Sequence, residues 1–183
     1  MTVDTIRAGQ EKHFPGIDLE DEDLADCQLE KINLAGANLV GADFSRSNLK
    51  GARLDGANLM QADLQLTDLR ANLLGANLMQ ADLSHADLRG SNLRGANLMG
   101  AKLAQASLSG AFLSGANLTG VNLKGVDLRG TDLRGVNLNS ANLKGANLSQ
   151  ADLQGANLSE TNLEEADLRG ANLAGANLTG ANL

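Results

Sequence analysis

A leucine at every fifth position is the feature that most restricts how this chain can fold. The series begins at Phe14, continues through Leu19 and Leu24, and runs with one interruption to Leu183. It has 35 members, of which 33 are leucine. An α-helix repeats about every 3.6 residues and a β-strand about every two, so neither places a five-residue series on one side. The period therefore predicts a repeat protein, in which one small unit recurs along the chain.

The other positions of each unit indicate how the chain turns. Two residues before the leucine the side chain is small, the residue directly before it is mostly Asn or Asp, and Gly is common two residues after it. A chain that turns a corner in every unit explains this pattern. The leucine and the small residue point inward, Gly allows the positive φ of a tight turn, and Asn or Asp binds nearby backbone. Such coils stack about 4.8 Å apart, although the period alone leaves the number of sides open.

The composition agrees with a repeat architecture. The 183 residues include three Phe but no Trp or Tyr, so the aromatic side chains that fill most globular cores are scarce. Leu and Ala supply almost all of the apolar content, beside 21 Gly. This mixture suits neither a helical bundle nor a sandwich, and a disordered chain would lack so regular a leucine series.

The units ANLMQ-ADLQL and ANLTG-VNLKG-VDLRG-TDLRG resemble the pentapeptide-repeat family, whose consensus is A(D/N)LXX. The resemblance covers residues 14–183. It implies an all-β fold, a right-handed quadrilateral parallel β-helix (solenoid) of close to nine coils with four sides each. Family members also carry N-terminal helical caps, and we expect residues 1–13 to form one, with a short helix around Val3–Ala8 that ends at Gly9.

The leucine period is interrupted once, where the step from Leu69 to Leu73 is four residues. The segment GANLMQADL occurs at 56–64 and again at 75–83, nineteen residues apart. We therefore expect one 19-residue coil within the domain 14–183, a changed turn near Arg70–Ala71, and faces that stay in register. Two interpretations of the skip remain. The missing residue is either a local sequence variation without a function, or it creates a bend or notch that a partner uses.

One outward row is apolar. With the faces in register, the position directly after the central leucine stacks similar side chains in successive coils, and a neighbouring face adds one more. Because contiguous exposed apolar groups are typical of binding surfaces and methionine is adaptable there, this row is the predicted protein interface. Its residues are Val40, Met60, Leu74, Met79 and Met99. The alternative is that each side chain is tolerated singly.

A second outward row is basic and could meet phosphates. It consists of Lys50, Arg70, Arg89, Arg129 and Arg169. However, an aspartate stands two residues before each of the four arginines, so local surface ion pairs explain the row without a ligand. Phe112 takes the place of the usual Asn or Asp and is expected to be exposed, as an isolated exception.

The charge is concentrated at one end. Residues 1–30 hold nine acids and two bases, which equals the whole net charge of −7, and residues 31–183 hold thirteen of each. Glu22 occupies an inward position that favours alanine. Because a buried carboxylate is costly unless it is paired or reaches water, we expect the coil around residues 17–26 to be distorted.

Catalytic, metal and cofactor sites are not expected. His13 and His85 lie far apart in the repeat, Cys27 is the single cysteine, and no glycine-rich phosphate-binding motif is present. Neither a signal peptide nor an apolar run of about 18 residues occurs, so the sequence favours the bacterial cytoplasm, without a membrane.

These observations favour a non-catalytic scaffold that binds a protein partner of unknown identity. The resemblance implies two alternatives: a mimic of DNA that binds DNA gyrase and protects against quinolones, and a regulator of signalling or differentiation. A DNA mimic needs negative potential along its length, and residues 31–183 have no net charge to supply it. Direct binding of nucleic acid is disfavoured because the basic row is expected to be paired with aspartates. The sequence stops at Leu183 within a regular repeat. Either the chain is truncated there or this end packs against another copy, and we expect a homodimer or higher assembly through the last coils.

Overall fold

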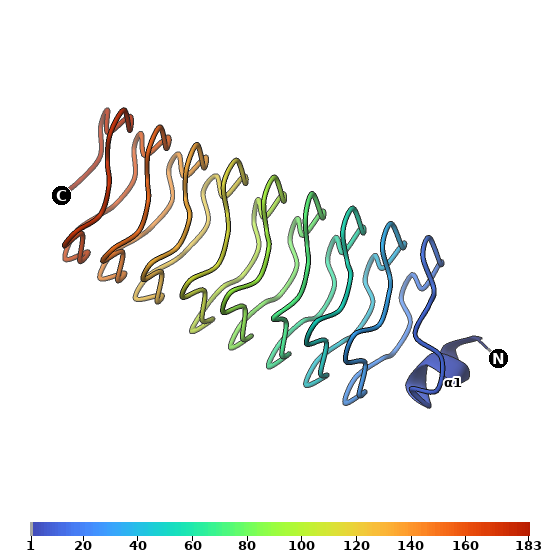
Figure 1. The fold of residues 1–183 in the computed structure, drawn as a ribbon. Helices are drawn as coiled ribbons and strands as arrows, with labels where there is room; N and C mark the ends of the chain where they lie inside the picture. Colours follow the sequence, from blue (N-terminus) through green and yellow to red (C-terminus); the bar gives the residue numbers. More distant parts are fainter. Residues whose placement is uncertain (1) are drawn as a thin grey trace.

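The computed structural model describes residues 2–183, and in it the chain winds into a column of stacked coils (Figure 1). One helix is found among the described residues, α1 (Thr2–Arg7), which lies at the N-terminal end of the column. The C-terminus lies at the opposite end. Among residues 2–183, no helix has the length and apolar character needed to cross a membrane.

The coils are joined by parallel β-bridges. The residue before each central leucine pairs with its equivalent in the next coil, as Asn38 does with Asn58 and Asn97 with Asn117. Partners are twenty residues apart outside the skip, and bridges recur every five residues. Each coil therefore has four sides, held by single bridges rather than long strands, and the predicted parallel β-solenoid is confirmed.

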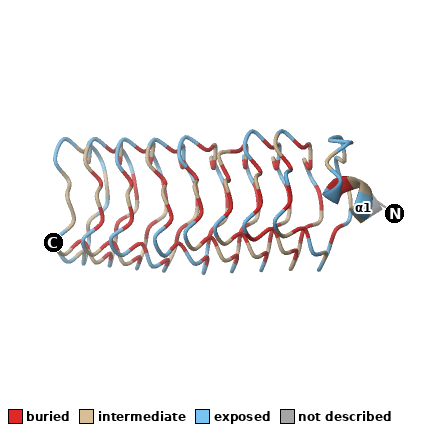
Figure 2. Cartoon of the chain, turned by 90° about the horizontal axis from the view of Figure 1, so that it is seen from below, coloured by how far each residue is buried: buried red, intermediate tan, exposed pale blue. Residues whose placement is uncertain are grey.

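We number the four faces in chain order. The first face carries Leu34, the second Leu39, the third Phe44 and the fourth Leu49, and each later coil repeats this order. Every central side chain points inward, so the core is a ladder of buried leucines between alanines, visible as red along the column (Figure 2). Burial of each leucine contributes roughly 1.5–3 kcal/mol relative to an exposed position.

The repeat unit explains each turn. In one typical unit the amide of Leu93 donates to the carbonyl of Phe112 in the next coil at 2.7 Å, and the amide of Ala96 closes the turn on the carbonyl of Leu93 at 3.0 Å. The corner between them is Gly95, with a φ of 63°. Glycine adopts this left-handed conformation without steric cost.

The skip produces a coil of nineteen residues. Bridge partners are nineteen apart from Arg53↔Asn72 to Asp68↔Asp87, and return to twenty at Asn72↔Asn92. At the shortened corner the amide of Ala71 donates to the carbonyl of Leu69 at 2.8 Å, two residues back. The faces stay in register above and below.

The N-terminal end differs slightly from the sequence-based expectation. The helix occupies Thr2–Arg7 rather than Val3–Ala8, and Gly9, with a φ of 66°, follows it. Ile6 is fully buried in the core.

The expected distortion around Glu22 is wrong. Its carbonyl accepts a regular hydrogen bond from the amide of Asp43 at 3.0 Å, and both neighbouring bridges, Asp18↔Asn38 and Asp23↔Asp43, are present. The side chain stays half-buried. Because the carboxylate is not fully removed from water, its cost is small enough for the coil to remain regular.

Candidate protein-binding surface

The apolar row on the second face forms a continuous strip. The methionine strip consists of Val40, Met60, Met79 and Met99, in four successive coils. The asparagines two residues before them form consecutive bridges, Asn38↔Asn58, Asn58↔Asn77 and Asn77↔Asn97. The strip residues are therefore stacked at the spacing of neighbouring strands, about 4.8 Å.

Asparagine side chains hold the backbone of the strip. The amides of Met60, Met79 and Met99 donate to the Oδ1 atoms of the asparagines two residues earlier, at 3.4, 3.3 and 3.2 Å. One of these asparagines, Asn77, also donates from Nδ2 to Oδ1 of Asn58 at 3.0 Å. These bonds fix the direction in which each strip residue leaves the coil, while its flexible side chain remains adaptable.

The second face carries charge before the strip, where Asp18 and Glu20 accept from Nδ2 of Asn38 at 2.9 and 3.0 Å, but not along the strip itself. From Asn38 to Ser159 no outward or corner position of the second face carries a charge, and the corner leading into this face is glycine in every coil. Met99 is the most exposed strip residue, with 41% of its surface accessible, and the other three are half-buried. A flat, neutral surface with apolar side chains is typical of the centre of a protein–protein interface.

Leu74 lies beside the strip but not in it. It is 47% exposed on the first face, and the corner Gly75 and the outward Asn77 separate it from Met79. Leu66, close to it in sequence, is an exposed corner residue between the third and fourth faces. The structure thus brings four of the five predicted interface residues together and leaves Leu74 across one corner.

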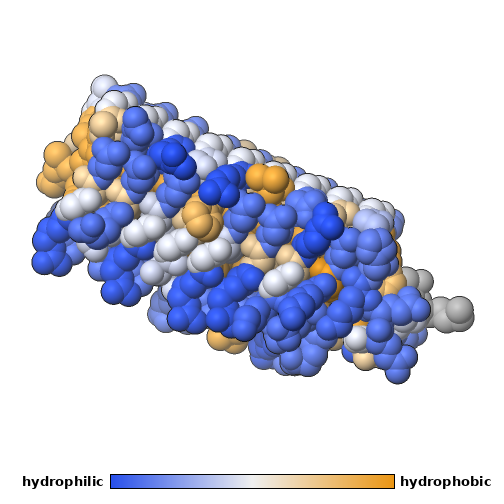
Figure 3. All heavy atoms as spheres, in the orientation of Figure 1, coloured by the Kyte–Doolittle hydropathy of each residue, from blue (hydrophilic) through white to orange (hydrophobic). Residues whose placement is uncertain are grey.

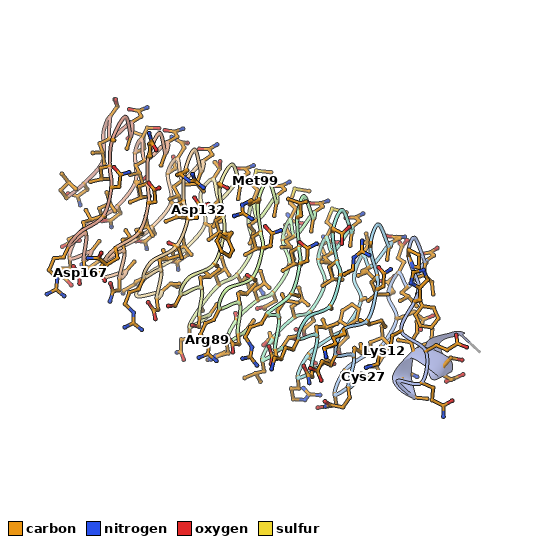
Figure 4. The ribbon with its side chains drawn as sticks, in the orientation of Figure 1. Lys12, Cys27, Arg89, Met99, Asp132 and Asp167 are labelled. Atoms are coloured by element: carbon orange, nitrogen blue, oxygen red, sulfur yellow. The ribbon has the colours of Figure 1, made fainter. Side chains whose placement is uncertain are left out.

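The basic row lies on the fourth face, opposite the strip, as Met99 and Arg89 show at opposite edges of Figure 4. Its arginines bind the aspartates two residues before them: Nη2 to Oδ2 distances are 2.6 Å for Arg89–Asp87 and 2.7 Å for Arg129–Asp127. Arg169–Asp167 and Arg70–Asp68 pair in the same way. Lys50 differs from the arginines, because the residue two positions before it is Asn48 rather than an aspartate.

The hydrogen bonds within these ion pairs shift the pKa values of both partners. The hydrogen bond from Arg89 lowers the pKa of Asp87, and that from Arg169 lowers the pKa of Asp167 to about 2. The pKa of Arg70 is raised, chiefly by its hydrogen bond to Asp68. The predicted local ion pairs are confirmed, and they occupy the arginines that a phosphate would need.

One contact on the first face has no counterpart in the sequence-based expectations. The guanidinium of Arg94 lies over the ring of Phe112, 4.4 Å from its centroid, and Nη2 is 3.9 Å from Oδ2 of Asp132. The sequence did contain the information for this contact. Arg94 directly follows Leu93, and Phe112 directly precedes Leu113, the equivalent leucine of the next coil. The side of the column seen in Figure 3 is otherwise mostly hydrophilic, with small separate apolar groups.

Residues with catalytic or metal-binding chemistry are dispersed. His13 lies on the first face, where Nδ1 is 3.1 Å from Nδ2 of Asn33, whereas His85 is a corner residue with a φ of 62°. Cys27 is buried and free. Among residues 2–183, no three His, Cys, Asp or Glu side chains are arranged to hold a metal ion.

The stacked four-sided coils, with leucine inside and Asn or Asp before it, define a β-solenoid built from units of five residues. The family model described as "Pentapeptide repeats" matches this chain in 8 copies, over residues 23–65 and 69–183. The chain belongs to the pentapeptide-repeat family. No match was found among the curated proteins.

Several solved structures are similar. HetL from the cyanobacterium Nostoc sp. strain PCC 7120, described as involved in heterocyst differentiation regulation, is 33% identical, with 99% of this chain and 93% of HetL covered and a TM-score of 0.42. QnrB1, a plasmid-mediated fluoroquinolone resistance protein, is 20% identical, with coverages of 92% and 90% and a TM-score of 0.43. Rfr23 from the cyanobacterium Cyanothece 51142 is 24% identical, with coverages of 100% and 94% and a TM-score of 0.19.

Proposed function

We propose that this protein is a non-catalytic scaffold that binds a protein partner through the methionine strip. The observation that carries the proposal is the alignment of Val40, Met60, Met79 and Met99 on a stretch of the second face that carries no charge from Asn38 to Ser159. Charged residues are depleted at the centres of protein interfaces, and methionine is enriched there. The rigid coil orders the backbone of the strip before binding, which reduces the entropy cost of association.

The finer architecture is part of the same proposal. We infer a right-handed column of close to nine coils, with α1 as the cap of its N-terminal end. Burial of Ile6 supports the cap, because this side chain covers apolar core that the first coil would otherwise expose. A capped, rigid column keeps the strip straight over successive coils.

The proposal can be tested by capture from a native lysate. The double variant Met60→Glu/Met79→Glu should lose the captured partner, because two carboxylates would be desolvated at the interface. The matched control Asn139→Glu/Ser159→Glu places two carboxylates in the same row, two and three coils beyond Met99, and should retain the partner. The captured protein is then titrated calorimetrically against each variant. Equal affinity for the Met60→Glu/Met79→Glu variant and the wild type would contradict the proposal.

The gyrase-binding alternative requires a different surface. A DNA mimic presents negative charge along its length, whereas here the arginines of the fourth face neutralise the neighbouring aspartates and the acidic excess lies in residues 1–30. A supercoiling assay with purified gyrase distinguishes the two, and inhibition by this protein would favour mimicry. A regulatory role, the one named for HetL, would operate through the methionine strip and is compatible with the scaffold.

Two further points remain proposals. We propose that a second copy covers the C-terminal end, where Leu168, Leu173 and Leu178 are only half-buried, Leu183 is exposed, and apolar surface gathers (Figure 3). Light scattering decides this: a monomer at tens of micromolar protein, on the order of typical assay concentrations, would contradict it. We also place the protein in the bacterial cytoplasm, where the thiol of Cys27 would stay reduced, and cell fractionation tests this location.

A further inference from the structure

Backbone hydrogen bonds between neighbouring coils follow a fixed scheme, and the scheme is incomplete at one place. The amides of Leu83 and Leu123, both central leucines of the third face, donate to the following coil at 2.8 Å. Between these two residues the equivalent bond of Leu103 does not reach normal hydrogen-bond geometry, although the bridge Lys102↔Asn122 is retained. Away from the column ends and the skip, five amides of the described chain lack a bond of normal geometry to the neighbouring coil: those of Gly100, Leu103, Gln105, Asn122 and Asp127.

All five amides border one interval, which we call the seam: residues 100–106 on one side and 119–127 on the other. The seam covers the third face, its two corners and the beginning of the fourth face, where Asp127 lies. Bonding is intact before it, from Leu98 to Asn117 at 2.8 Å, and on the opposite face, from Leu113 to Asp132 at 2.7 Å. Beside it the bond from Leu108 to Asp127 is stretched to 3.2 Å. The two coils therefore separate as a wedge that opens on the third face, and the lower corners stand wider apart where the ribbon passes from yellow-green to gold (Figure 1).

Burial and cavity volume agree with an opened seam. A cavity of about 410 Å³ lies there, lined among others by Gly100, Lys102, Leu103, Val121 and Asn122. The inward alanines on its N-terminal side, Ala101 and Ala106, are 5% and 3% exposed, whereas Ala81 and Ala111 are fully buried. Water can thus reach backbone that is closed elsewhere.

Side-chain volume explains part of the separation. The small inward positions of the coil after the seam hold Val121, Val126, Thr131 and Val136, whereas the coils on both sides have alanine at all four positions. The wider coil is mismatched on both sides. On its C-terminal side, however, the amide of Asn142 still donates to the carbonyl of Val121 at 3.0 Å. Volume alone therefore does not open the column.

The second cause is the loss of side-chain bonds in the coil before the seam. Lys102 and Ser107 stand where Asn or Asp is usual, and neither accepts the backbone bond from two residues later. On the intact side, Asn142 accepts from the amide of Lys144 at 3.1 Å and Asn147 from that of Ser149 at 3.0 Å. These bonds hold the outward backbone in place, so the column opens where the volume mismatch and the missing bonds coincide.

We propose that the seam is a built-in opening of the column, at which two rigid segments move relative to each other with the first face as the hinge. Met99 directly precedes Gly100 at the rim of the seam. Opening would move Met99 away from Thr119 in the next coil, and would leave the spacing of Met60, Met79 and Met99 unchanged. The seam therefore gives the methionine strip a movable end. The opening of the seam does not depend on what the strip binds.

Amide hydrogen exchange of the full-length protein, resolved residue by residue by NMR, tests the seam directly. The amides of Leu103 and Asn122 should exchange at least about tenfold faster than those of Leu83 and Leu123 on the same face, because local opening exposes them. Equal protection of the four amides would overturn the proposal.

Two variants test the cause. Lys102→Asn/Ser107→Asn restores the usual residues and should slow exchange at Leu103 and Asn122 by about tenfold. The reciprocal variant Asn142→Lys/Asn147→Ser removes the bonds on the other side of the wide coil, and should accelerate exchange at Leu123 by a similar factor. Thermal unfolding checks that both variants fold. Unchanged exchange at the seam in the first variant would overturn the proposal.

Discussion

The skip and the seam are two departures from the same repeat, with opposite consequences. At the skip one residue is missing, yet the bonds on both sides are short: Leu54 donates to Asn72 and Leu73 to Asn92, each at 2.7 Å. At the seam the count of residues is regular and the bridges persist, yet five amides lose the normal geometry of their bonds. The comparison teaches that the column depends on the fit between stacked coils more than on the number of residues in a corner. A corner can close with one residue fewer, whereas a mismatch of inward volume, together with the missing side-chain bonds of Lys102 and Ser107, weakens the bonds between two coils.

The largest effect should come from emptying the core beside each irregularity. Leu73→Ala, in the well-bonded coil after the skip, should reduce the free energy of unfolding by roughly 2–5 kcal/mol through lost burial and a residual cavity. Leu103→Ala, at the seam, should lie at the lower end of this range because the neighbouring backbone can relax. Urea unfolding measures both. A larger loss for Leu103→Ala than for Leu73→Ala would contradict the comparison.

The next largest effect on stability should come from removing hydroxyl groups at inward positions. Thr67, two residues before Leu69, donates from Oγ1 to the carbonyl of Phe44 at 2.9 Å, whereas the buried Oγ of Ser91 has no partner. Thr67→Val should cost about 1 kcal/mol, and Ser91→Ala should be neutral or stabilising, since an unpaired buried hydroxyl is unfavourable. Chemical denaturation of the two variants side by side checks this difference. A loss of stability in Ser91→Ala would show that its hydroxyl is bonded after all.

A smaller effect on stability is expected when the pH is lowered. The pKa of Asp87, next to the skip on the fourth face, is lowered chiefly by its hydrogen bond from Arg89, and Arg70 lies 3.5 Å from it. Because the folded-state pKa is below the unfolded value, the pair stabilises the protein above about pH 4, and this contribution disappears as the pH falls through the folded-state pKa. Solvent screens the pair, so the shift in denaturation midpoint should be small.

The variant Asp87→Asn measures this contribution. Its denaturation midpoint should lie below that of the wild type at neutral pH and converge with it in strong acid. A difference that grows as the pH falls would have the wrong sign and would contradict the assignment of the ion pair.

The smallest effect should follow from repairing the skip. Insertion of Gly between Arg70 and Ala71 restores the five-residue step and lengthens only the corner between the fourth and first faces. Because the coils on both sides are already bonded, stability should change by less than about 0.5 kcal/mol. Thermal unfolding measures this, and a large gain in the unfolding temperature would show that the short corner is strained.

Much of the fold could be predicted from residues alone. The leucine period indicated the coils, the repeated GANLMQADL segment indicated the register across the skip, and aspartates two residues before arginines indicated the ion pairs. These features are local or strictly periodic. The regular coil at Glu22, the contact of Arg94 with Phe112 and the seam were not predicted, because each depends on how far one side chain reaches from its own coil.

The sequence by itself determined which side chains enter the core and which form each outward row, because a five-residue turn leaves every position only one direction to point. Only the tertiary structure decided where neighbouring coils bond completely. That outcome depends on small differences in volume between Val121 and Ala101 or Val126 and Ala106, twenty residues apart in the chain, and on whether Lys102 and Ser107 can replace the bonds of asparagine. Such differences act through close packing, where a single methyl group changes the distance between two coils.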